Sequence, residues 1–133
     1  MLHDPYREGL RLFNEHLFFD AHEALEDVWR AASEPDRKFF QGLIQVAVAL
    51  HHHSRGNMVG CRSLLERARR NLTPYPPAYG GLDLAAFLHS VDQWRVALES
   101  GRPAPEPPTR ILADLLQSVG RSHPPQPARL FAS

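Results

Sequence analysis

The stretch DAHEALEDVW, residues 20–29, spaces its apolar residues as an amphipathic helix does. At about 100° per residue, His22 and Glu26 fall on the same broad arc as the apolar side chains, and Trp29 follows one turn later. Side chains four positions apart are neighbours on a helix surface. The sequence therefore predicts a helix whose core-facing side carries an ionisable pair.

Four further helices are predicted around this one from capping residues and apolar spacing. Asp4 before Pro5 is typical of a helix start, and Asn57 and Asp83 are candidate N-caps further along the chain. Pro35 opens the third helix, with Ser33 or Glu34 as its expected cap. The predicted helices cover about residues 5–14, 18–32, 35–54, 58–72 and 84–100, and the last ends at Gly101.

The fold class predicted from this pattern is all-α, because no segment alternates with the period of a strand. Short connections favour a small bundle of about five helices, arranged as two antiparallel helical hairpins plus a C-terminal helix. Residues 1–101 are expected to form the helical domain. Residues 102–133 are expected to be a proline-rich linker and tail, with a short docking helix at 109–119.

Composition excludes several classes of protein. The 133 residues suit one domain, and 15 basic residues balance 15 acidic residues, which argues against nucleic-acid binding. Cys61 is the one cysteine, so no intrachain disulfide is possible. The longest apolar run, LIQVAVAL, is too short to span a membrane. We expect a cytoplasmic protein with no membrane partner.

A carboxylate buried on the arc of the second helix needs a partner, because removing a charge from water costs on the order of several kcal/mol. His22 satisfies this need only in part. The third helix is apolar nearly all round, except for a stripe that contains Gln41, Gln45 and His52. Helical phase ranks His52 first as the histidine that faces His22, and His51 follows closely.

These donors suggest a metal site as one interpretation. His22 and Glu26 can both reach a divalent ion such as Zn²⁺, Fe²⁺ or Mn²⁺, and His52 or His51 is expected to add a ligand. If the chain is an enzyme, the expected reaction is metal-assisted hydrolysis with Glu26 or Glu23 as the base.

Established catalytic motifs do not match this sequence. His22-Glu23 begins an HExxH pattern, but Glu26 stands in place of the second histidine. Neither a di-iron tetrapeptide, a P-loop nor a nucleophile elbow occurs in the sequence. Cys61 shares an arc with apolar residues and is expected to pack in the core.

The motif HxxxExxW, formed by His22, Glu26 and Trp29, resembles the signature of the family called domain of unknown function 309. The flanking FNEHLFFDAHEALEDVWR, the segment FFQGLIQVAVALHHHSRGN and the later GLDLAAFL are similar to that family as well. The resemblance covers about residues 5–98. It implies a small all-helical domain of uncharacterised activity, in which the motif is functionally important and metal binding is a suggested role for its histidine and glutamate.

Two functions are therefore in competition. In the first, Trp29, Gln41 and Gln45 line a polar pocket around the His/Glu pair, and the pocket binds a divalent metal or a small polar ligand. In the second, the pair is a structural hydrogen-bond network in a non-enzymatic interaction module. A shift of about 40 residues lays Leu25 on Leu65, as in stacked helical hairpins, and the tail is then expected to dock on a protein partner or in a homodimer.

Overall fold

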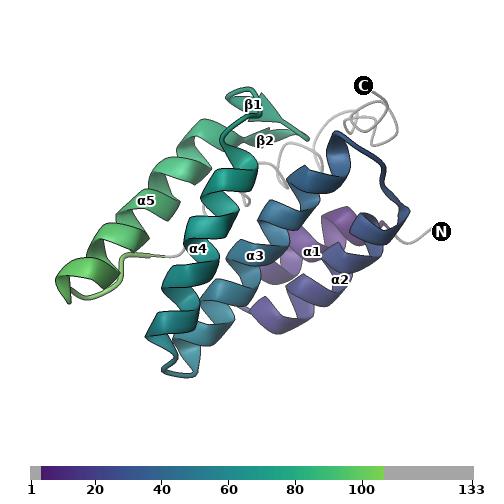
Figure 1. Ribbon diagram of the computed structural model, residues 1–133. Helices are drawn as coiled ribbons and strands as arrows, with labels where there is room; N and C mark the ends of the chain where they lie inside the picture. Colours follow the sequence, from purple (N-terminus) through teal and green to yellow (C-terminus); the bar gives the residue numbers. More distant parts are fainter. Residues whose placement is uncertain (1–3, 107–133) are drawn as a thin grey trace.

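The structure, a computed structural model, describes residues 4–106, which form five helices and one small β-hairpin (Figure 1). This arrangement confirms the predicted all-α fold class. The elements in chain order are α1 (Pro5–Asn14), α2 (Phe18–Ala31), α3 (Asp36–Ser54), α4 (Met58–Leu72), β1 (Ala78–Tyr79), β2 (Leu82–Asp83) and α5 (Leu84–Ser100).

The predicted capping residues account for three of the five helix starts within residues 4–106. Asp4 accepts hydrogen bonds from the N–H groups of Tyr6 and Arg7 at the start of α1. Asn57 accepts from Gly60 at the start of α4, and Asp83 caps α5 in the same way. Each cap satisfies a backbone donor that the first helical turn leaves free. The expected helix boundaries agree with the observed ones to within one residue.

The start of α3 differs from the predicted cap. Pro35 occupies the N-cap position itself and offers no side-chain acceptor. Glu34, one residue earlier, accepts a hydrogen bond from the N–H of Lys38 at 3.2 Å. Glu34 therefore still supplies an acceptor to the first turn of α3. It does so from one residue before the N-cap, because Pro35 occupies the N-cap position.

The helices pack as two antiparallel hairpins followed by α5. Figure 1 shows α2, α3, α4 and α5 side by side in that order, with α1 behind α2, and the contacts between neighbouring helices agree. The two hairpins meet along α2 and α3. A Cβ atom at Gly42 would lie 2.5 Å from Cγ of Leu72, so α3 and α4 approach more closely than an alanine permits.

A short β-hairpin lies between α4 and α5. Ala78 pairs with Asp83, and Tyr79 pairs with Leu82. Gly80 turns the chain with a φ of +61°, and its carbonyl accepts a hydrogen bond of 2.7 Å from the Tyr6 hydroxyl. Strands of two residues leave no periodic signal, and contacts with α1 and α3 hold them in place.

The chain turns back after α5. Gly101 adopts a left-handed conformation, and the N–H of Arg102 donates to the carbonyl of Ala97. The indole Nε1 of Trp94 donates to the carbonyl of Glu106 at 3.1 Å, which holds residues 102–106 against α5. The predicted helix at 109–119 and the rest of the tail lie outside the described residues. The proposed division at residue 101 stays a prediction.

The described helices are each either too short or too polar to cross a bilayer. The expected cytoplasmic location stays a prediction.

Candidate functional site

The buried stripe of α2 is narrower than the sequence predicts. Ala21, Leu25 and Val28 face the core, whereas the side chains of His22 and Glu26 are 18% and 37% exposed. The expectation that both ionisable groups are fully turned inward is therefore wrong. The predicted arc was too broad, because it included the side chains of His22 and Glu26, which lie at the edge of the contact with α3.

His22 and Glu26 form an ion pair along this edge of α2. Nε2 of His22 lies 3.3 Å from one carboxylate oxygen of Glu26, and Arg30 lies 3.3 Å from the other oxygen. Nδ1 of His22 lies 3.1 Å from the carbonyl of Phe19. Both neighbours of the imidazole nitrogens are oxygen atoms that can accept hydrogen bonds. Solvent and Arg30 together satisfy a carboxylate that the sequence predicts to be buried.

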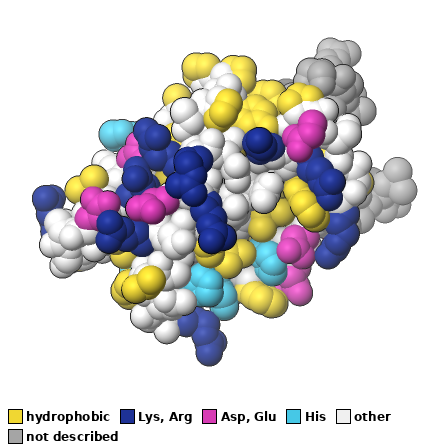
Figure 2. All heavy atoms as spheres, in the orientation of Figure 1, with side chains coloured by type: hydrophobic (Ala, Val, Ile, Leu, Met, Phe, Trp, Pro, Cys, Tyr) yellow, Lys and Arg dark blue, Asp and Glu magenta, His cyan; other side chains and the backbone are white. Residues whose placement is uncertain are grey.

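The histidines at the end of α3 are distributed among different neighbours. His51 contacts the ring of Phe19 on α2, with a centroid distance of 5.3 Å, and the same Phe19 ring lies 5.2 Å from the ring of His22 on α2. His52, ranked first from helical phase, instead has Nδ1 3.3 Å from the amide nitrogen of Asn57. Figure 2 shows histidine side chains on the lower part of this face, near hydrophobic and acidic groups. Of the two predicted candidates, His51 is thus the one that approaches α2.

The donor set does not fit the expected divalent ion in this arrangement. Within residues 4–106, no group of three or more His, Cys, Asp or Glu side chains is placed to hold a metal. His22 and Glu26 supply two donors, and the ring of His51 contacts Phe19. A structural or catalytic site of the usual kind needs at least three protein ligands.

A cavity of about 220 Å³ opens between α2 and α3, beside this ion pair. Three of its lining residues, Trp29, Gln41 and Gln45, were predicted from sequence to bind a ligand. His22 does not line it, and Glu23 is exposed and also lies outside the lining. The lining residues are Glu26, Trp29, Gln41, Ile44 and Gln45.

Both polar and apolar side chains line the cavity. Oε1 of Gln45 accepts a hydrogen bond of 2.8 Å from the Asn71 side chain, which directs the amide group of Gln45 and leaves its N–H groups available. Gln41 is exposed, and Glu26 offers a carboxylate. Amides and a carboxylate provide both donors and acceptors within a small volume.

Arg37 stands next to this cavity and was missed by the sequence interpretation. Its guanidinium carbon lies 4.0 Å from the centre of the Trp29 ring, a cation–π contact. Arg37 precedes Gln41 by four positions and therefore shares the stripe of Gln41 and Gln45. The four-residue spacing between Arg37 and Gln41 is the feature of the sequence that could have identified Arg37 as a neighbour of the cavity. Asn71 lies on α4, and helical phase within α2 and α3 gives no indication of it.

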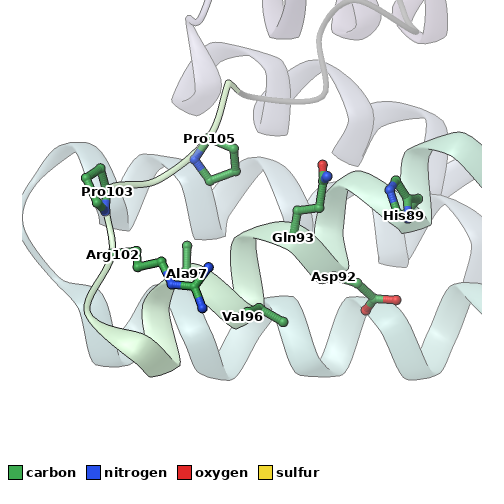
Figure 3. A pocket seen from close by; sticks show the side chains of 8 residues that line it. All are labelled: His89, Asp92, Gln93, Val96, Ala97, Arg102, Pro103 and Pro105. Atoms are coloured by element: carbon green, nitrogen blue, oxygen red, sulfur yellow. The ribbon is translucent and has the colours of Figure 1, made fainter.

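A larger cavity of about 420 Å³ lies between α5 and the returning segment 102–105 (Figure 3). Figure 3 shows Gln93 pointing toward the side of Pro105, whereas Asp92 points away from it. Asp92 is engaged by Arg69 at 2.7 Å and by Arg95 at 3.1 Å. Its carboxylate is thus committed to holding α4 and α5 together.

A comparison with known protein families matches residues in the N-terminal half of this chain. Residues 6–64 match the family described as Domain of unknown function (DUF309), which confirms the resemblance carried by the HxxxExxW motif. The matched segment includes all five residues that line the α2–α3 cavity. The cavity on α5 falls outside it.

Two curated relatives are uncharacterised proteins. One, from Aquifex aeolicus, is 29% identical over 98 residues, which cover 73% of this chain and 29% of the relative. The other, YpuF of Bacillus subtilis, is 41% identical over 56 residues, which cover 41% of this chain and 32% of that protein. The matches span about a third of the length of each relative.

Proposed function

We propose that this chain is a binding domain whose α2–α3 cavity accepts a small, planar, polar group. The observation that carries the proposal is the convergence of Glu26, Gln41 and Gln45 with the Trp29 indole on one cavity. Ligand sites in proteins usually combine apolar walls with a few placed polar groups. Trp29 and Ile44 supply such walls here.

The size of the cavity limits the ligand. A volume of about 220 Å³ is below the roughly 300–1,000 Å³ of sites that enclose drug-sized molecules. A single aromatic or heteroaromatic ring with one polar substituent suits this space. Gln45 donates, Gln41 donates or accepts, and Glu26 accepts, so a ring that carries a planar polar substituent is the expected class.

A hydrolytic role has less support than binding. Glu23, one of the two expected bases, is exposed and lies outside the cavity. Glu26 lines the cavity but is held by His22 and Arg30. In the binding proposal, this ion pair orients the Glu26 carboxylate toward the ligand.

The two tryptophans give a direct test. We would titrate the full chain with nicotinamide and with uracil, and follow both indole N–H resonances in nitrogen–proton correlation spectra. The Trp29 resonance is expected to shift with a dissociation constant on the order of millimolar. The Trp94 resonance should stay in place, because that N–H donates to Glu106.

A matched pair of variants localises the effect. Gln41→Leu removes a polar group of the cavity and should abolish the Trp29 shift. Gln93→Leu makes the same substitution on α5, at the other cavity, and should leave the shift unchanged. Absence of any Trp29 shift with both compounds, or an equal shift in Gln41→Leu, would refute the proposal.

A further inference from the structure

Arg37 carries an uncompensated positive charge beside the proposed binding cavity. Among residues 4–106, no carboxylate lies within ion-pair distance of its guanidinium group, which instead lies over the Trp29 ring. Four other arginines of the two hairpins, Arg11, Arg30, Arg62 and Arg69, do form ion pairs. For example, Arg30 pairs with Asp27 and Glu26, and Arg62 pairs with Glu66 and Glu99.

Two neighbouring N–H groups at this position also lack acceptors. Nε of Arg37 and Nε1 of Trp29 are shielded from solvent, and neither donates a hydrogen bond to any part of the chain that the structure describes. Leaving a donor buried without an acceptor costs free energy, more so on a charged group. Both groups are donors, and one of them is cationic. Both N–H groups can donate a hydrogen bond to an oxygen acceptor, and the bond to the cationic group is strongest when that oxygen is negatively charged.

The carboxylate that lines the cavity, that of Glu26, does not meet this need. One oxygen of Glu26 faces His22, and the other faces Arg30, each at 3.3 Å. Both partners lie on α2, whereas Arg37 lies on α3, one turn before Gln41. The charge of Glu26 is therefore largely balanced on its own helix, and Arg37 remains available to a ligand.

We infer that the ligand of the α2–α3 cavity is an aromatic carboxylate, with its ring against the cavity wall and its carboxylate on Arg37. This inference rests on the proposed function and specifies its ligand class. A planar guanidinium fork matches a carboxylate with two parallel hydrogen bonds. The ring occupies the space between Trp29 and Ile44, where Gln41 and Gln45 supply further hydrogen bonds.

The test compares two compounds that share a ring and differ in one substituent. Nicotinate and nicotinamide share a ring, but one carries a carboxylate and the other a carboxamide. The wild-type chain is expected to bind nicotinate about tenfold more tightly, as judged from the Trp29 indole resonance. High salt should reduce this preference, because it screens the partly exposed ion pair.

Variants at Arg37 and Arg55 show which side chain causes the preference for nicotinate. Arg37→Gln should reduce the roughly tenfold preference for nicotinate over nicotinamide to about equal binding. Arg37→Lys keeps the charge but loses the fork, so an intermediate preference is expected. Arg55→Gln is the control, because Arg55 ends the same helix about 27 Å away at 1.5 Å per residue and is exposed without an ion pair among the described residues.

The possible failures can be told apart. Equal affinity of the wild type for both compounds overturns the inference and leaves the proposed function in place. No Trp29 shift with either compound overturns both. If Arg37→Gln does not fold, the preference in Arg37→Lys decides: a full preference in that variant, unchanged by salt, contradicts a role for the Arg37 fork.

Discussion

The hydroxyl group of Tyr79 donates a hydrogen bond to the carboxylate of Asp36. Asp36 is 2% exposed and is the one charged residue that is fully buried within residues 4–106. The bond ties the β-hairpin to the first turn of α3, and Tyr6 ties the same hairpin to α1 through the carbonyl of Gly80. Two tyrosine hydroxyls thus fix a hairpin that is too short to be stable alone.

Tyr79→Phe should lower the free energy of unfolding by about 1–3 kcal/mol, because it leaves a buried carboxylate without this donor. Urea unfolding measures the change. Tyr75→Phe is the comparison, since the Tyr75 hydroxyl donates to the carbonyl of Pro35 at a more exposed position. The free energy of unfolding should fall by less in Tyr75→Phe than in Tyr79→Phe. Equal costs for the two variants would show that the Asp36 contact contributes nothing particular.

Glu26→Gln should change stability by less than about 1 kcal/mol, because exposed or half-exposed ion pairs contribute little. This prediction separates a binding site from the structural network that is the rival interpretation. Thermal unfolding of wild type and variant provides the measurement. A fall in the melting temperature of many degrees would instead show that His22, Glu26 and Arg30 hold the hairpins together.

Gly42→Ala should destabilise the chain by about 1–3 kcal/mol, because overpacking forces neighbouring groups to move. The new Cβ would lie 2.5 Å from Cγ of Leu72, at the contact between α3 and α4. Gly56→Ala is the control. It introduces strain at a φ of +81° but meets no atom within 4 Å. A larger cost at Gly56 than at Gly42 would contradict the close helix approach.

Stability should fall in alkaline solution because of a buried thiol. Burial raises the pKa of Cys61 from 9.0 to about 11. Below pH 9.0 the thiol is neutral in both states and has no effect. Between pH 9.0 and about 11 the unfolded chain loses this proton and the folded chain retains it, so stability declines as pH rises.

Cys61→Ala should flatten this decline in urea unfolding measured across the same pH range. A residual decline is expected above pH 10.0, where burial and the charge of Asp4 raise the pKa of Tyr6 above its ordinary value. An unchanged slope in Cys61→Ala would show that the thiol does not titrate differently in the two states.

Local patterns in the sequence predict the helices well, because each helix carries its own signals. Asp4, Asn57 and Asp83 mark starts, and Gly101 marks an end, in agreement with the structure. The β-hairpin has no such signal. Its position depends on hydrogen bonds between residues far apart in the chain, from Tyr6 to Gly80 and from Tyr79 to Asp36, and such contacts are not encoded within a short window.

Helical phase predicted which side chains lie on the same side of α2 and α3 more accurately than it predicted their burial and their neighbours. Helical phase brought Trp29, Gln41 and Gln45 to one side, and the structure places all three around one cavity. Phase alone does not give the angle at which two helices cross, which is why His51 rather than His52 approaches α2. It also overestimated the width of the buried stripe, so Glu26 was expected to be buried when it reaches solvent.

The hydrogen bond from the Trp94 indole to Glu106 makes this side chain an optical sensor. The emission spectrum of a tryptophan responds to the polarity around its indole. Detachment of residues 102–106 from α5 would therefore alter the fluorescence of Trp94. A chain with Trp29 replaced by phenylalanine therefore reports attachment of this segment in solution without any added dye.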